Sequence, residues 1–133
     1  MTETRLETRR FKAGEDLFRE GEEGHDAFLI REGYVAVWRM QEGRRISLGT
    51  RSEGEVVGEM ALIDETVCSA TVTAGSDVEV QVVTKEELEA ALAGSPDVVS
   101  TILYQLLESL RTANDLIAMY ATKLEELTAG RKQ

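Results

Sequence analysis

The chain has 133 residues, of which 42% are hydrophobic and 30% charged, and a formal net charge of −10. This length suits one domain with a real core, and the negative charge argues against a surface that binds nucleic acid. Cys68 is the only cysteine, so no internal disulfide can form. The start of the chain is polar, unlike a secretory signal, and no apolar run of about 18 residues could span a membrane. We therefore expect a cytoplasmic protein without membrane insertion.

Residues 1–10 are strongly polar and are predicted to be a short helix or a frayed end. From residue 11 to residue 84, short apolar runs alternate with glycines. Strands at such close spacing, with turn residues between them, predict a small and mostly antiparallel sandwich or barrel.

The clearest strands are residues 27–30 and 34–40, joined at Glu32-Gly33. In the second of them Val35, Val37 and Arg39 alternate with residues of the opposite face. A turn at residues 41–43 leads towards a strand at 45–48, and residues 78–83 form the last strand, with its valines on one face.

Helical signals begin at Thr84. With Glu87 three residues later, Thr84 predicts a capping box and a helix that ends at Gly94. Ser95 and Pro96 then predict the cap and first turn of a second helix, which meets no breaker before Gly130.

Apolar residues of this second helix recur at alternating steps of four and three, which is typical of a coiled coil. The predicted seam consists of Leu106, Leu110, Ala113, Ile117, Tyr120, Leu124 and Leu127. We therefore expect a parallel homodimer, the alternative being a helix that packs only within its own chain.

Residues 58–71 predict a strand, a turn at Gly58, a short helical turn and another strand. A helix that begins at a glycine presents N–H groups and a positive dipole end, which suits a phosphate. The segment nevertheless carries Glu59, Asp64 and Glu65 and no basic residue.

Several segments resemble the cyclic nucleotide-binding domain of catabolite activator-type regulators, protein kinase regulatory subunits and cyclic nucleotide-gated channels. They are residues 11–21, the hairpin at 28–37, the Gly-Glu-Met-Ala-Leu of residues 58–62 and the Ala-Thr-Val of residues 70–72. The resemblance implies an antiparallel β-roll or jelly roll (a double-stranded β-helix) followed by C-terminal helices, an α+β fold. It divides the chain into a polar segment 1–10, the nucleotide-binding-like roll 11–94, a long dimerisation helix 95–129 and a tail 130–133.

The family's phosphate-binding cassette carries an arginine that pairs with the cyclic phosphate, and Cys68 stands at that position here. A neutral thiol is a weak donor without charge, whereas a guanidinium gives a bidentate pair. The resemblance implies a ligand site made of Val57, Gly58, Glu59, Met60, Ala61, Cys68, Ser69, Ala70 and Asn114. Within it Glu59 would accept the ribose 2′-hydroxyl, and the N–H groups of Met60 and Ala61 would meet the phosphate.

A replacement cation would have to come from elsewhere, and Arg44, Arg45 and Arg51 are the candidates by sequence position. Cys68 itself is read as a small buried residue, with a reactive thiolate favoured by the helix dipole as the alternative. The only histidine, His25, is read as a turn residue, because no metal cluster or catalytic triad accompanies it.

We interpret the chain as a stand-alone, non-enzymatic sensory module with weak or altered binding of cAMP or cGMP, without catalytic residues, metal or other cofactor. It would signal through the dimer helix to an unidentified output protein, without contacting nucleic acid directly. The alternative is a structural or protein-interaction dimer that keeps the fold and binds no small ligand.

Overall fold

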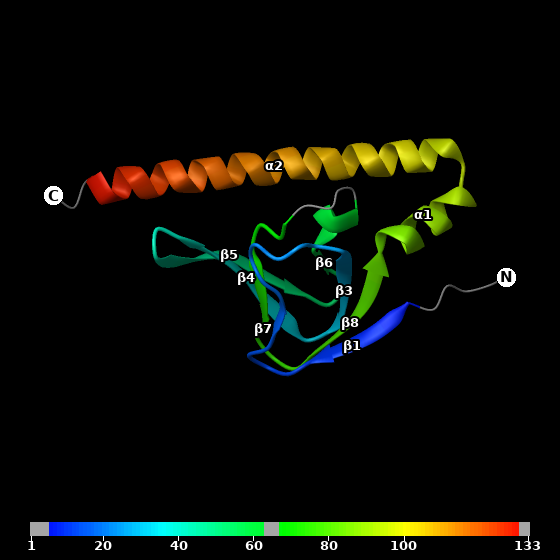
Figure 1. Ribbon diagram of the computed structural model, residues 1–133, viewed down its shortest axis with the longest axis horizontal. Helices are drawn as coiled ribbons and strands as arrows, with labels where there is room; N and C mark the ends of the chain where they lie inside the picture. The colour runs from blue at the N-terminus through cyan, green and yellow to red at the C-terminus, as the bar shows by residue number, and fades with distance from the viewer. Residues whose placement is uncertain (1–5, 63–66, 131–133) are drawn as a thin grey trace. The chain divides into compact units, whose positions relative to one another are not determined.

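The protein divides into two units, Met1–Ser95 and Pro96–Gln133. The structure is a computed structural model that describes residues 6–62 and 67–130. The first unit is built of β-strands, one 3-10 helix and one short α-helix, and the second unit holds a single long helix (Figure 1).

Two four-stranded sheets, antiparallel at every pairing, make up the first unit. One sheet has the order β1 (Glu7–Phe11), β8 (Val78–Thr84), β3 (Asp26–Glu32) and β6 (Val56–Val57). The other has the order β2 (Asp16–Phe18), β7 (Thr71–Ala74), β4 (Tyr34–Gln41) and β5 (Arg44–Ser52). The predicted α+β class, an antiparallel β-roll followed by helices of which the last is long, is confirmed.

The core lies between the two sheets and is built by strand alternation. Val78, Val80 and Val82 of β8 are all buried, as their period of two predicts. They meet buried residues of the second sheet, among which Val35 of β4 and Val72 of β7 are almost completely covered. Aliphatic packing from both sheets therefore fixes the strand register, because a slip of one residue would turn these side chains outward.

Tight turns connect the strands of the hairpins. Gly33, between β3 and β4, has φ +85°, and a Cβ atom there would collide with the backbone carbonyl of Asp77. Glu42 and Gly43, between β4 and β5, both have positive φ, as the two central residues of a type I′ turn require. The predicted turn at residues 41–43 is confirmed.

The N-terminal segment differs from its prediction. Residues Glu7–Phe11 form strand β1, which pairs with β8 along its whole length, rather than a short helix or a frayed end. Its side chains are mostly exposed, so the strand shows no apolar period. The backbone pairing with β8, far along the chain, stabilises it instead.

Helix α1 (Lys85–Ala93) follows β8 without a loop. The Glu87 N–H donates to the Thr84 hydroxyl oxygen at 3.0 Å, and that hydroxyl donates to the Glu87 carboxylate at 3.1 Å, which confirms the N-terminal cap. Gly94 is the C-cap, as predicted. Ser95 was predicted to cap the second helix. Its hydroxyl instead donates to the Ala91 carbonyl at 3.3 Å, at the end of α1.

The second unit contains helix α2 (Asp97–Gly130), 34 residues without a break. At 1.5 Å per residue this helix is about 51 Å long. Six of the seven predicted seam residues are large apolar side chains exposed in the single chain, namely Leu106, Leu110, Ile117, Tyr120, Leu124 and Leu127. The seventh, Ala113, is exposed too.

Candidate ligand-binding site

The first half of the predicted site is a sharp turn between β6 and the 3-10 helix η1 (Glu59–Leu62). Gly58 makes this turn with φ +76°, and a Cβ atom there would lie 3.0 Å from the Asp26 carbonyl oxygen and 3.3 Å from the Phe18 ring. Both the backbone angle and the lack of space therefore require glycine. Ala61 and Leu62 of η1 are buried and anchor the turn to the roll.

The helical turn after Gly58 is shorter than a phosphate-binding helix. It spans only the four residues of η1, and the Ala61 N–H donates to the Gly58 carbonyl at 3.1 Å. That N–H already has a protein partner, so a phosphate would have to compete for it. Two acidic residues of the predicted segment, Asp64 and Glu65, lie outside the described residues.

The second half of the site is fastened to the turn after β2. The Cys68 N–H donates to the Glu22 carbonyl at 2.7 Å, and the Gly21 N–H donates to the Cys68 carbonyl at 2.9 Å. Two residues further on, Ala70 is buried at the entry to β7, whereas Ser69 is exposed. The backbone of the cassette is thus held in place although its expected arginine is missing.

The Cys68 side chain is half-buried. Burial raises the pKa of its thiol above the ordinary value, and the nearby Glu22 carboxylate raises it further. The thiol is therefore neutral at neutral pH, which is contrary to the thiolate that the alternative interpretation of Cys68 requires. Neither a positive charge nor a strong donor stands at this position.

The predicted ligand residues fall in two segments of the first unit and at one position of the second unit. Val57 to Ala61 and Cys68 to Ala70 belong to the unit that holds the β-roll. The Val57 side chain is buried in the core, and Glu59 and Met60 are half-buried. Asn114 lies on α2 in the other unit, so its part in the site stays a prediction.

The cations proposed from sequence position are engaged elsewhere or exposed. The Arg45 guanidinium stacks over the Trp38 ring at 4.0 Å. Arg51 lies 3.7 Å from the Glu55 carboxylate through its Nε and donates from Nη1 to the Thr50 carbonyl. Arg44 is exposed at the start of β5. None of the three shows the unpaired, inward charge that an anion would need.

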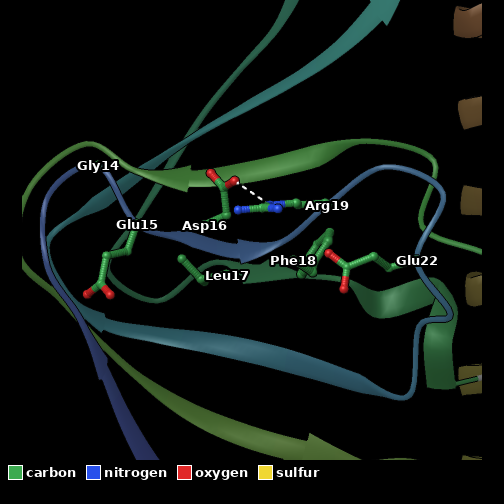
Figure 2. Close-up of a pocket in the computed structure, with 7 residues that line it drawn as sticks. All are labelled: Gly14, Glu15, Asp16, Leu17, Phe18, Arg19 and Glu22. Atoms are coloured by element: carbon green, nitrogen blue, oxygen red, sulfur yellow. Dashed lines mark hydrogen bonds and ion pairs between the residues drawn. The ribbon is translucent and has the colours of Figure 1, made fainter.

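A separate hollow of about 460 Å³ lies against β2, lined by residues 14–19 and Glu22. Figure 2 shows Asp16 and Arg19 joined across one side of the strand, with Leu17 on the other side. The lining holds three carboxylates, those of Glu15, Asp16 and Glu22, and one guanidinium. This acidic lining does not suit an anionic ligand, and none of the predicted site residues belongs to it.

Within residues 6–62 and 67–130, no group of three or more His, Cys, Asp or Glu side chains is placed to hold a metal ion. No helix within the same ranges is long and apolar enough to cross a membrane. His25 is exposed and lies 3.5 Å from the Glu23 carboxylate in the turn before β3.

Comparison with known proteins identifies the fold and the family. A family model described as "Cyclic nucleotide-binding domain" matches residues 8–95, which include α1 and all of the roll except Glu7, the first residue of β1. The cAMP-dependent protein kinase regulatory subunit of Mycosarcoma maydis is 35% identical over 85 residues, 62% of this chain and 16% of that protein. The cyclic AMP receptor protein of Thermus thermophilus is 29% identical over 110 residues, 82% of this chain and 51% of that protein.

Solved structures with a similar fold lead to the same family. The EAL enzyme Bd1971 in its half-site-occupied form has a TM-score of 0.73 and 33% identity, over 82% of this chain and 98% of that one. The same enzyme is known in cGMP-bound and cAMP-bound forms. Because this chain spans only 16% to 51% of the curated relatives above, the likeness concerns one domain of them. The chain belongs to the cyclic nucleotide-binding domain family.

Proposed function

We propose that the chain is a regulatory module that binds cAMP or cGMP weakly, through Val57 to Ala61 and Cys68 to Ala70, and signals through a homodimer of α2. The module is not catalytic: it changes shape on binding and acts through a partner protein. The proposed compartment is the cytoplasm.

The observation that carries the proposal is the state of the cassette. Its backbone keeps the left-handed turn at Gly58 and the fastening of Cys68 to Glu22, both of which a nucleotide site would use. The raised pKa of Cys68 leaves a neutral thiol where the family places an arginine. A bond to a charged group contributes about 1.5–3 kcal/mol, so its loss weakens binding about 10- to 150-fold without changing the fold.

Calorimetric titration of cAMP and cGMP into the wild type and a Cys68→Arg variant tests this. We expect millimolar or high micromolar binding by the wild type and about 10- to 150-fold tighter binding by the variant. A Val67→Arg variant is the matched control, since it adds the same charge one residue away, on a side chain that is 59% exposed.

Equal gains in Cys68→Arg and Val67→Arg would show a general charge effect rather than a restored cassette. If neither the wild type nor Cys68→Arg binds either nucleotide at millimolar concentration, the cassette is only structural. The protein-interaction dimer would then be the better interpretation.

Ligand binding is proposed to reach α2 through α1. Helix α1 contacts both η1 and β8, and it ends at Gly94, one residue before the boundary between the two units. Contact of a nucleotide with the turn at Gly58 would shift α1 and bend the chain after Gly94. Because the ligand favours one of two arrangements, it shifts their populations.

The homodimer is proposed from the exposed seam of α2. Large apolar side chains along one stripe of a 34-residue helix are unfavourable in water and are buried when a second copy pairs with it. Light scattering after size exclusion should give a dimer mass for the wild type and a monomer mass for Leu110→Glu. Thr112→Glu, which adds the same charge off the seam, should remain dimeric, and a monomeric wild type at micromolar concentration contradicts the seam.

A further inference from the structure

Arg39 lies on the face of β4 that turns towards the core. Side chains two residues apart in a strand share a face, so Arg39 follows Val35, which is fully buried, and Val37, which packs against the core. The opposite face is fixed by Trp38, whose indole N–H donates to the Thr73 hydroxyl at 2.9 Å. A guanidinium therefore follows two aliphatic residues on the inner face of this strand.

The charge of Arg39 is not compensated by the residues that the structure describes. Its Nη2 donates to the Gln41 side-chain oxygen at 3.3 Å, a neutral partner. Its Nε is buried, and no acceptor for it exists within residues 6–62 and 67–130. A buried donor without an acceptor costs free energy, and the cost is larger for a charged group. Such a group is explained if its partner is a molecule that the chain binds.

The strand register brings Arg39 to the cassette. Along β4 and β7 the pairs run from Val35 with Ala74 to Trp38 with Thr71. The residues that come next at that end, just beyond the paired ones, are Arg39 of β4 and Ala70, which precedes β7. Ala70 closes the Cys68 to Ala70 half of the cassette, and it is buried.

The other inward arginine has its own partners. Arg51 of β5 pairs with Val35 across the strands and so shares the inner face. Its Nε faces the Glu55 carboxylate at 3.7 Å, and its Nη1 donates to a backbone carbonyl. Arg39 differs from it in having a buried donor left over.

We infer that Arg39 supplies the positive charge for the cyclic phosphate of the ligand, from β4, in place of the cassette arginine that Cys68 replaces. The inference rests on the proposed function, because it assigns a residue to the same nucleotide site. It explains together the neutral cassette position and the uncompensated guanidinium beside it. The anion would accept the Nε hydrogen and neutralise the charge.

The test compares wild type, Arg39→Ala, Arg39→Gln and Arg44→Ala by titration with cAMP and cGMP. Removing Arg39 should weaken binding at least about 10-fold, so that no binding is measured at millimolar nucleotide, whereas Arg44→Ala, which removes the same charge from an exposed position, should leave it unchanged. Adenosine and guanosine, which lack the phosphate, should bind all four proteins equally. Arg39→Gln keeps most of the side chain's volume and serves where the alanine variant unfolds.

The outcomes separate this inference from the proposed function, with the Cys68→Arg protein as reference. If Cys68→Arg and wild type bind a cyclic nucleotide but the Arg39 variants bind it as well as wild type, the role of Arg39 is overturned and the proposed function stands. Tighter binding by Arg39→Ala would also overturn it, since the side chain would then fill the site. If no protein binds, Cys68→Arg included, both fail.

Discussion

The glycine at the cassette turn allows a sharp test of how the site is packed. Gly58 and Gly43 have nearly the same backbone angle, φ +76° and φ +77°, but different surroundings. A Cβ at Gly43 meets nothing within 4 Å, whereas at Gly58 it meets the Asp26 carbonyl oxygen at 3.0 Å and the Phe18 ring at 3.3 Å. Substitution by alanine at either position should cost about 1–3 kcal/mol for the left-handed backbone. Only Gly58→Ala should add about 1–3 kcal/mol for overpacking.

Urea unfolding followed by tryptophan fluorescence measures this difference. Trp38 is the only tryptophan of the chain and lies in β4, so its signal reports on the β-roll. We expect the free energy of unfolding to fall further in Gly58→Ala than in Gly43→Ala. Equal losses in the two variants would refute the reasoning, because they would show that the cassette turn yields to a methyl group without cost.

Two further predictions concern the cap of α1 and the thiol of the cassette. Thr84→Ala should lower the free energy of unfolding by about 0.5–2 kcal/mol, because the Thr84 hydroxyl accepts the Glu87 N–H. Thr84→Ser keeps a hydroxyl and should recover most of this loss. Equal losses in the two variants would show that the hydroxyl does not stabilise the helix. Since its pKa is raised, Cys68 should react with iodoacetamide more slowly than free cysteine at neutral pH and faster as pH rises, and Glu22→Gln should speed the reaction by lowering that pKa. If the alkylation rate stops rising at a pH below the pKa of a free thiol, the raised pKa of Cys68 is contradicted.

Local patterns in the sequence predicted much of the fold. The alternating valines of β8, the turn at residues 41–43 and the Thr84 cap depend on residues close in sequence, and all are observed. Strand β1 was missed because its residues are polar and exposed and its partner β8 lies about 70 positions away along the chain. Pairing through the backbone leaves no trace in side-chain order.

The candidate site was predicted as a set of positions rather than as an electrostatic environment. The resemblance pointed to Cys68, and alternation put Arg39 on one face with Val35 and Val37. The sequence did not show that the Arg39 Nε is buried without an acceptor, or that the Arg45 guanidinium stacks over the Trp38 ring. These two features depend on how separate strands pack together. Charges in a site are set by tertiary packing, which a single sequence does not display.

The direct passage from β8 into α1 has a mechanical consequence. Thr84 is at once the last residue of a strand bonded on both sides by β1 and β3 and the cap of the helix that follows. Because no connecting residue separates strand and helix, only the backbone dihedral angles around Thr84 and Lys85 can change the direction of α1 relative to β8. The next place where the chain can bend is the Gly94-Ser95-Pro96 junction, so a displacement of α1 produced at η1 would be passed on to this junction.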